Sequence, residues 1–241
     1  MPVKHHDAWV RRSSFSQVNK FIGSFIFFFF IHVSWGREIN LQNIHARISA
    51  IKSFTPWDTY QIDFECVNKV NSLSGSLVGR NEGREIHFIM QTQPMVEIIF
   101  DKLHPENLLR DGVLYPASHW LDPIVESCGC CYFMIAMPFL DWELINFEQT
   151  AKRGRKVLKC CLLAPENFPN VKRVVMYIDE NFNTLMEAYA YNYTETLCAQ
   201  LVLQSFKKLD KNTWHFKSVL FTCGQWSSKI QVIRGRPLKT T

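Results

Sequence analysis

The chain has 241 residues, of which 47% are hydrophobic and 20% charged, a composition typical of a folded globular protein and not of a disordered one. Its formal net charge is +5, but residues 1–36 supply +3 of it, and the remainder carries 23 basic against 21 acidic residues. No basic stripe is left that would indicate nucleic-acid binding, so we expect no nucleic-acid partner.

Residues 1–36 have the features of an export signal. A basic stretch ends at Lys20, the apolar run FIGSFIFFFFIHVSW of 15 residues follows, and Ser34 and Gly36 then stand two apart, as a signal peptidase requires. The run is shorter than the roughly 20 residues that span a membrane. We expect a cleaved signal peptide, with a retained anchor or a buried segment as alternatives. The mature protein would begin near Arg37 and work in the periplasm or cell envelope as a single domain over 37–241.

The segment 39–54 predicts an amphipathic helix. It places four apolar residues on one stripe, with Asn40 as a cap at the start and Pro56 as a stop after the end. The stripe consists of Leu41, Ile44, Ile48 and Ile51.

Strand patterns follow over 59–67, 74–80, 84–92 and 95–101, separated by turn residues. The last two each present one apolar face, formed by Ile86, Phe88 and Met90 and by Val96, Ile98 and Phe100. Residues 102–131 are less regular, with one short strand at 112–116. We predict a short helix over 137–149 that starts after Pro138 and packs Phe139, Trp142 and Leu144 inward.

The C-terminal half predicts six more strands, at 155–165, 174–178, 185–191, 198–210, 212–223 and 227–235. With about ten strands joined by short connections, an antiparallel meander is favoured. The hairpin 174–191 is apolar on both faces. Alternation places Leu185 with Glu187 and Tyr189, and we expect Glu187 to be an outer-face residue between tyrosines, not a general acid. The basic stretch 152–156 predicts a hairpin tip.

No catalytic motif stands out, since the sequence lacks G-x-S-x-G, H-E-x-x-H and a phosphate-binding loop. The histidines are scattered. Cys128, Cys130 and Cys131 include a C-x-x-C spacing, but no second pair follows that would complete a zinc site. The eight cysteines can be buried or loop thiols, can include disulfides in an exported protein, or can bind metal or do redox chemistry. We expect the first, and no enzyme activity, cofactor or metal.

Several stretches resemble the periplasmic lipoprotein-carrier (LolA-like) family over roughly residues 38–235. After the signal and helix, LSGSLVGR and IHFIMQ resemble the start of its sheet. MPFLDWE resembles its short Leu-Pro-Phe-type helix, RGRKVLKCCLLAP its Gly-Arg strand, and VVMYIDENFNTLMEAYAYN its Trp-Ile-Asp hairpin, with Tyr177 where Trp is usual. LVLQSFKKLDKNTWHFKSVLF resembles the penultimate hairpin.

The resemblance implies a mainly β fold, a strongly curved antiparallel barrel that does not close, with helices over its concave side. Between them an apolar cavity would hold the acyl chains of a lipoprotein or another lipid. The expected cavity lining is Ile86, Phe88, Met90, Val96, Ile98, Phe100, Phe139 and Trp142, and the helix of 39–54 would be a lid. The partners implied are an inner-membrane transporter and an outer-membrane receptor, and we expect a monomer.

The sequence also departs from the family pattern. RNEGRE stands where a Pro-Gly-Lys-type turn is usual, so the arginine that latches the lid can be Arg80 or Arg84. The cysteine-rich loop is not a usual family feature. The alternatives to a carrier are a cell-envelope protein-interaction module on the same half-barrel, without lipid cargo, and a thiol-active enzyme built on Cys128 and Cys131.

Overall fold

The computed structural model describes residues 40–53, 60–69, 71–80, 85–101, 108–125, 128–166, 168–208 and 214–237. The chain divides into two units, Met1–His45 and Ala46–Thr241, and the sheet lies within the second. The predicted signal peptide falls outside the described residues. None of the helices described is both long and apolar enough to cross a membrane.

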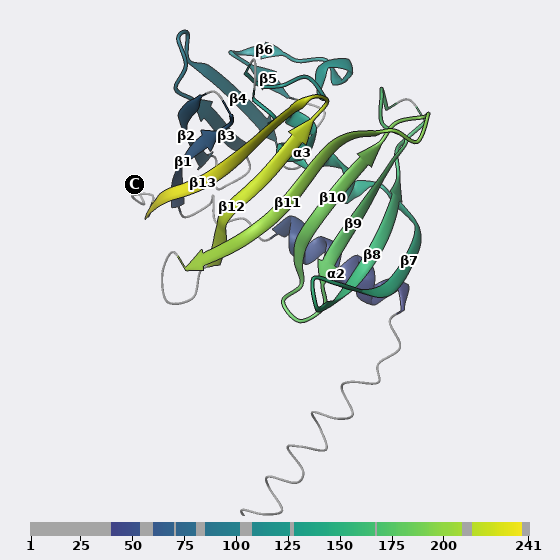
Figure 1. Ribbon diagram of the computed structural model, residues 1–241. Helices are drawn as coiled ribbons and strands as arrows, with labels where there is room; N and C mark the ends of the chain where they lie inside the picture. The colour runs from purple at the N-terminus through teal and green to yellow at the C-terminus, as the bar shows by residue number, and fades with distance from the viewer. Residues whose placement is uncertain are drawn as a thin grey trace, which may run out of the picture. The chain divides into compact units, whose positions relative to one another are not determined.

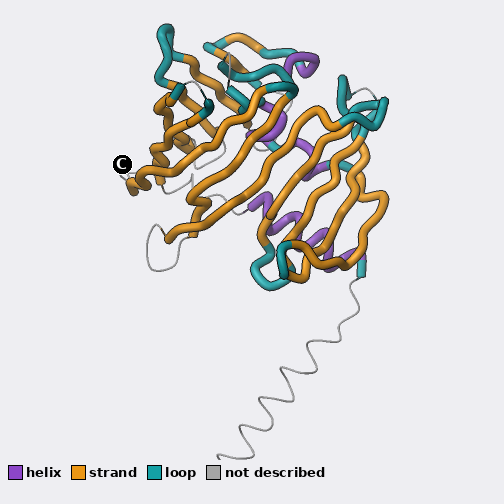
Figure 2. Tube along the Cα trace, in the orientation of Figure 1, coloured by secondary structure: helices purple, strands orange, loops and turns teal. Residues whose placement is uncertain are grey.

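Thirteen strands form one antiparallel sheet in the described part of the chain (Figures 1 and 2). They are β1 (Tyr60–Val67), β2 (Ser72–Arg80), β3 (Glu85–Met90), β4 (Val96–Asp101), β5 (Leu109–Arg110), β6 (Val113–Leu114), β7 (Glu143–Lys152), β8 (Arg155–Leu163), β9 (Arg173–Asp179), β10 (Thr184–Tyr191), β11 (Leu197–Lys208), β12 (Trp214–Cys223) and β13 (Trp226–Pro237). Chain neighbours pair along each half, and β1 pairs with β13, which joins the halves. β6 and β7 are the two edges, so the barrel is unclosed.

The predicted fold class is therefore confirmed, with thirteen strands instead of about ten. The helices described are α2 (Leu41–Ser53), α3 (Tyr132–Ala136) and the 3-10 helices η3 (Ala117–His119) and η4 (Pro138–Asp141). In α2 the backbone N–H of Asn43 donates to the side-chain oxygen of Asn40 at 2.9 Å, so the predicted cap is present. Register shifts in several strand pairs, including one in β1 and two between β11 and β12, bend the sheet.

The helix predicted over 137–149 is wrong beyond Asp141. A single 3-10 turn spans Pro138–Asp141, Trp142 is extended with φ −79° and ψ 161°, and the chain then runs as β7. The reason is the tight turn at Arg153 and Gly154, which both have positive φ. This turn places β7 beside β8. The hydrogen bonds between the two strands satisfy the backbone N–H and C=O groups that a helix would otherwise have paired internally. The prediction of a hairpin tip at 152–156 is confirmed.

The predicted faces of the 174–191 hairpin are corrected at Leu185. A β-bulge between Leu185 and Glu187 shifts the register, so that Leu185 pairs with Ile178 and Ala188 pairs with Met176. Directly paired residues share a face, so Leu185 lies with Ala188 and not with Glu187. The bulge thereby turns Leu185 toward the concave side of the sheet.

Glu187 is almost fully buried on the other face and is surrounded by partners. Its carboxylate pairs with Lys152 and, at 2.9 Å, with Arg153, and it accepts a hydrogen bond from the Tyr189 hydroxyl. The Lys152 ammonium also lies 3.7 Å from the ring centroid of Tyr177. The outer face of the hairpin is thus covered by a charged and aromatic cluster contributed partly by the β7–β8 turn.

The concave side of β1 to β4 depends on one glycine. Gly75 of β2 pairs with Phe64, and a Cβ at Gly75 would lie 2.5 Å from the ring of Phe64 and 2.6 Å from the carbonyl oxygen of Ile89. Phe64 in turn stacks on Phe88, with ring centroids 5.1 Å apart. Because the ring occupies the space of the missing side chain, the aromatic pair can lie flat on the sheet.

We therefore expect Gly75→Ala to lower the free energy of unfolding by about 1–3 kcal/mol, the usual cost of overpacking a core. Urea unfolding followed by tryptophan fluorescence measures the change. Ser74→Ala, at the exposed neighbouring position, is the control and should stay within about 0.5 kcal/mol of wild type. Equal stability of the two variants would show that Phe64 does not depend on Gly75.

Candidate functional site

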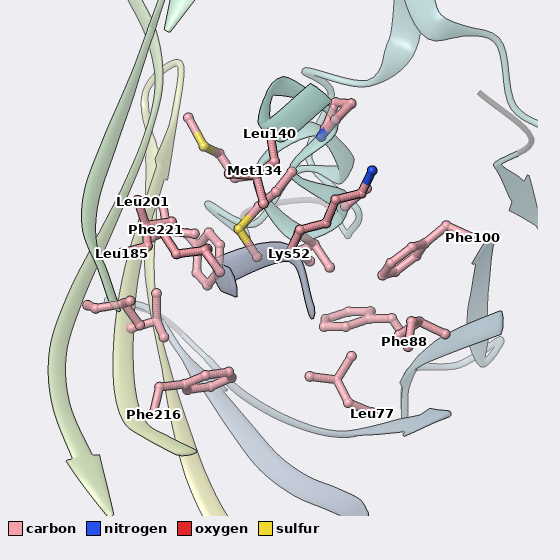
Figure 3. Close-up of a pocket in the computed structure, with 18 of the residues that line it drawn as sticks. Lys52, Leu77, Phe88, Phe100, Met134, Leu140, Leu185, Leu201, Phe216 and Phe221 are labelled. Atoms are coloured by element: carbon pink, nitrogen blue, oxygen red, sulfur yellow. The ribbon is translucent and has the colours of Figure 1, made fainter. Parts of the chain in front are cut away.

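An apolar cavity of about 190 Å³ lies on the concave side of the sheet (Figure 3). Its sheet wall comes from two groups of strands, β2 to β4 and β10 to β13, and its cover from α3, η4 and the end of α2. The labelled side chains of Figure 3 show this, with Phe88 and Phe100 facing Leu185 and Phe221 across the space and Met134 above. The lining aromatic residues are Phe88, Phe100, Phe206, Phe216 and Phe221.

Polar side chains are confined to a few positions in the lining, namely Lys52, Asp101, Asp141, Asn183 and Thr184. Lys52 of α2 forms an ion pair with Asp141 of η4, and both side chains are nearly half exposed. The remaining wall is built from aliphatic, aromatic and methionine side chains. Such a cavity favours hydrocarbon and offers few groups that could bind or activate a polar substrate.

The sequence-predicted lining and the observed lining overlap in part. Ile86, Phe88 and Phe100 line the cavity. Met90, Val96 and Ile98 are buried on the same face but do not line it. The strand register accounts for Met90 and Val96, which pair with each other in the row of Gly75 and Phe64, one step from the end of the sheet where Cys66 lies. That end is occupied by residues 128–130, whose thiols contact Cys66. Ile98 instead pairs with Phe88, in a cavity-lining row, and on its other side with Arg110 of β5.

Phe139 and Trp142 do not line the cavity either; they lie in an aromatic cluster behind its cover. The cluster joins α3 and η4 to the segment after β8, with Phe133 5.6 Å from Phe139 and 5.5 Å from Trp142, and Trp142 4.9 Å from Phe168 between ring centroids. Such ring pairs add to the stability that area burial already gives. The cluster therefore fixes the position of Met134, which does face the cavity.

The part of α2 within the second unit contributes Ile51 and Lys52 to the cavity, while Ile48 is buried nearby without lining it. Leu41 and Ile44 belong to the first unit, and the cavity is built from the second unit alone.

Arg47 holds this part of α2 to the β9–β10 turn. Its guanidinium donates to the carbonyl oxygen of Glu180 at 3.0 Å and to the side-chain oxygen of Asn183. Asp179 shapes that turn, because its carboxylate accepts the backbone N–H of Asn181 at 2.9 Å. Of the two predicted latch residues, Arg80 is exposed at the end of β2 and Arg84 lies outside the described residues. Arg47 was not identified from the sequence as a residue that holds the helix to the sheet. The only indication in the sequence was that Arg47 lies outside the apolar stripe of the helix.

A second cluster of chemistry-bearing side chains lies beside the cavity. The Sγ atoms of Cys66, Cys128 and Cys130 all lie within 4.8 Å of one another, and all three residues are buried. The neighbouring thiols of Cys130 and Cys66 lower the pKa of Cys128, while the contact with Cys128 raises the pKa of Cys66. Burial raises the pKa of Cys130. The sequence indicated no complete set of metal ligands around Cys128. It did not identify Cys66 as a neighbour, because Cys66 is far from the C-x-x-C stretch in sequence.

Comparison with solved structures identifies similar folds at low sequence identity. An outer membrane lipoprotein-sorting protein domain from Vibrio parahaemolyticus superposes with a TM-score of 0.59 at 11% identity, covering 82% of this chain and 93% of that one. A LolA superfamily protein from Nitrosomonas europaea gives 0.57 at 11%, covering 85% and 96%. A DUF1329 family protein from Desulfovibrio piger gives 0.52 at 9%, covering 82% and 92%.

No protein-family model and no curated protein matches the sequence. The structural likenesses rest on identities far too low to carry function, but they agree on architecture. The predicted resemblance is confirmed at the level of the fold: the chain has the open half-barrel of LolA superfamily structures.

The contacts of Arg47 predict how firmly the end of α2 is held. Arg47→Ala removes both hydrogen bonds to the β9–β10 turn, at about 1–2 kcal/mol together, so amide exchange over residues 48–53 should accelerate roughly 5- to 30-fold. Hydrogen–deuterium exchange with mass spectrometry measures this. Lys52→Ala is the matched control, since an exposed ion pair contributes about 0–1 kcal/mol and should change exchange by less than about fivefold. Unchanged exchange in Arg47→Ala would mean that the helix is held by its apolar contacts alone.

Proposed function

We propose that the protein is an exported carrier that holds the acyl chains of a lipoprotein, or of another lipid, in the concave cavity, and that it takes part in outer-membrane lipoprotein sorting. The observation that carries the proposal is the cavity wall, in which aromatic and aliphatic side chains from seven strands face one another across an open space. A half-barrel whose concave face served only as a core would be filled by its own side chains.

The volume of the cavity limits what fits without movement. An engineered cavity of roughly 150 Å³ accepts benzene, so about 190 Å³ holds on the order of six to eight carbon atoms of a chain. A full acyl chain therefore requires the cover to shift. The cover is suited to this, because the Lys52–Asp141 pair that joins α2 to η4 is half exposed and contributes little stability.

The N-terminal segment and the fold together support a place of action in the periplasm or cell envelope. The basic stretch, short apolar run and small residues before Arg37 support export to the periplasm or envelope. Solved structures with this fold include a domain that is named for outer membrane lipoprotein sorting. We further propose that the protein receives its cargo from an inner-membrane transporter and passes it to an outer-membrane receptor. Its role in this transfer is to bind the cargo without catalysing a reaction.

Binding of a chain-length series tests the proposal. Each methylene buried contributes about 0.8 kcal/mol, so the dissociation constant should fall about fourfold per added carbon until the cavity is full, with a smaller gain once the cover has to move. Displacement of a fluorescent fatty acid by fatty acids of increasing length measures the series on the purified full chain.

Charged substitutions in the cavity provide the second arm of this test. Phe88→Glu places a carboxylate in the wall and should weaken binding at least about 30-fold, from a desolvation cost of roughly 2 kcal/mol or more. Phe216→Glu changes a half-buried lining position and serves as the same test if Phe88→Glu does not fold. Phe147→Glu, in a groove elsewhere on the sheet, is the control and should bind like wild type. Binding without chain-length dependence, or unaffected by both cavity variants, would favour the protein-interaction module instead.

A further inference from the structure

The chain segment Cys128–Cys131 is attached to the sheet at several points. Gly129 packs so closely on β13 that a Cβ there would lie 2.6 Å from the Cα of Ser227, and its N–H donates to the Ser228 hydroxyl at 2.8 Å. The Cys131 thiol is in contact with Cys223 of β12, which with burial raises its pKa. The segment leads directly into α3, whose Met134 and Ile135 line the cavity. Whatever fixes this segment therefore fixes one end of the cavity cover.

The contact between the Cys66 and Cys128 sulfurs is closer than packing requires. The Sγ atoms of Cys66 and Cys128 lie 3.0 Å apart, inside the roughly 3.5–4.0 Å of ordinary nonbonded heavy-atom contact. Cys66 to Cys130 is 3.8 Å. Cys66 belongs to β1 and the other two to the segment, so a bond between them would connect residues 62 positions apart.

Three neighbouring thiols can bind a metal ion, or two of them can form a disulfide, and the charge of the site favours one of these arrangements over the other. A soft metal ion held by three thiolates would leave the buried site with net negative charge, which is costly unless a cation compensates it. The groups that act most strongly on these three thiols are one another, burial and Ser228, with no lysine, arginine or histidine among them. A disulfide is neutral and needs no such partner.

We propose that Cys66 and Cys128 form a disulfide bond that links β1 to the base of the cavity cover, with Cys130 remaining a buried thiol beside it. The oxidant is a small-molecule or protein disulfide of the envelope. The Cys128 thiolate attacks one sulfur of the oxidant and releases the first thiol; the Cys66 thiolate then attacks Cys128 and releases the second. Two electrons pass from the protein to the oxidant, and each released thiolate takes up the proton that a cysteine has lost.

Burial determines when this can occur. Cys66, Cys128 and Cys130 are each at most 2% exposed, so the oxidant reaches them before the segment packs on the sheet and not afterwards. Exported proteins fold under oxidising conditions, where such bonds form and persist. Once formed, the bond is shielded from thiols in solution.

Peptide mapping tests the proposal and does not depend on any lipid cargo. The exported protein is recovered from the envelope fraction of producing cells, acid-trapped, alkylated without reduction and digested with trypsin. Cleavage after Lys52 and Lys69 isolates Cys66, while Cys128, Cys130 and Cys131 share the peptide 111–152. We expect these two peptides to be covalently linked and to separate on reduction. Cys161, which is partly exposed, should be alkylated in the native protein and is the positive control.

Two serine variants identify the partner of Cys66. Cys130→Ser should keep the linked peptide and Cys128→Ser should lose it, whereas the reverse pattern would contradict the assignment to Cys128. Alkylation of Cys66 before reduction would overturn the proposal. Stoichiometric zinc or copper by elemental analysis, together with three thiols that are free after denaturation, would overturn it in favour of a metal site. The same linkage should form when reduced full chain refolds with glutathione disulfide, which tests the bond without reliance on export.

Discussion

The structure depends on how the concave face of an open sheet is covered. A barrel that closes satisfies its edges and fills its interior from all sides, but here β6 and β7 remain apart and the apolar face between them must be kept from water. The sheet alone cannot do this. The cover consists of short, irregular pieces, α3, η4 and the end of α2, and its attachment to the sheet determines whether a cavity exists and how large it is.

The attachments differ in kind, and this difference has a functional consequence. The base of α3 is fixed by an aromatic cluster around Phe133 and by the buried cysteine segment, both of which resist opening. The end of α2 is held by the hydrogen bonds from Arg47, at about 1–2 kcal/mol together, and by the half-exposed pair of Lys52 with Asp141, at about 0–1 kcal/mol. In the proposed carrier, such a cover would admit a chain by moving the end of α2 while α3 stays in place.

Sequence patterns predicted the sheet well because alternation has a period of two and the connections are short. The strands of β1 to β4, the apolar faces of β3 and β4 and the cap at Asn40 followed from local rules. The helix over 137–149 was wrong because its apolar spacing fits a helix as well as a strand, and only pairing with β8 decides between them. Leu185 was assigned to the wrong face because a bulge leaves no clear mark in a single sequence.

The cavity was less predictable than the fold. Alternation identified which residues of β3 and β4 share a face, but not that the cysteine segment would occupy the end near Met90. Of the six residues predicted on these two strands, Ile86, Phe88 and Phe100 line the cavity. Two features depend on the pairing of β1 with β13, a long-range pairing that no local pattern encodes. They are the part of the cavity wall that β10 to β13 supply and the contact of Cys66 with Cys128.

In the proposed function, the cavity carries hydrocarbon in the cell. Native mass spectrometry of the protein purified from its own envelope, without detergent exchange, tests this most directly. The account predicts a species heavier than the bare chain by the mass of a lipid or acylated peptide, which is released on organic extraction and identified by fragmentation. A protein that leaves the envelope with an empty cavity, while remaining associated with another folded protein, would contradict it.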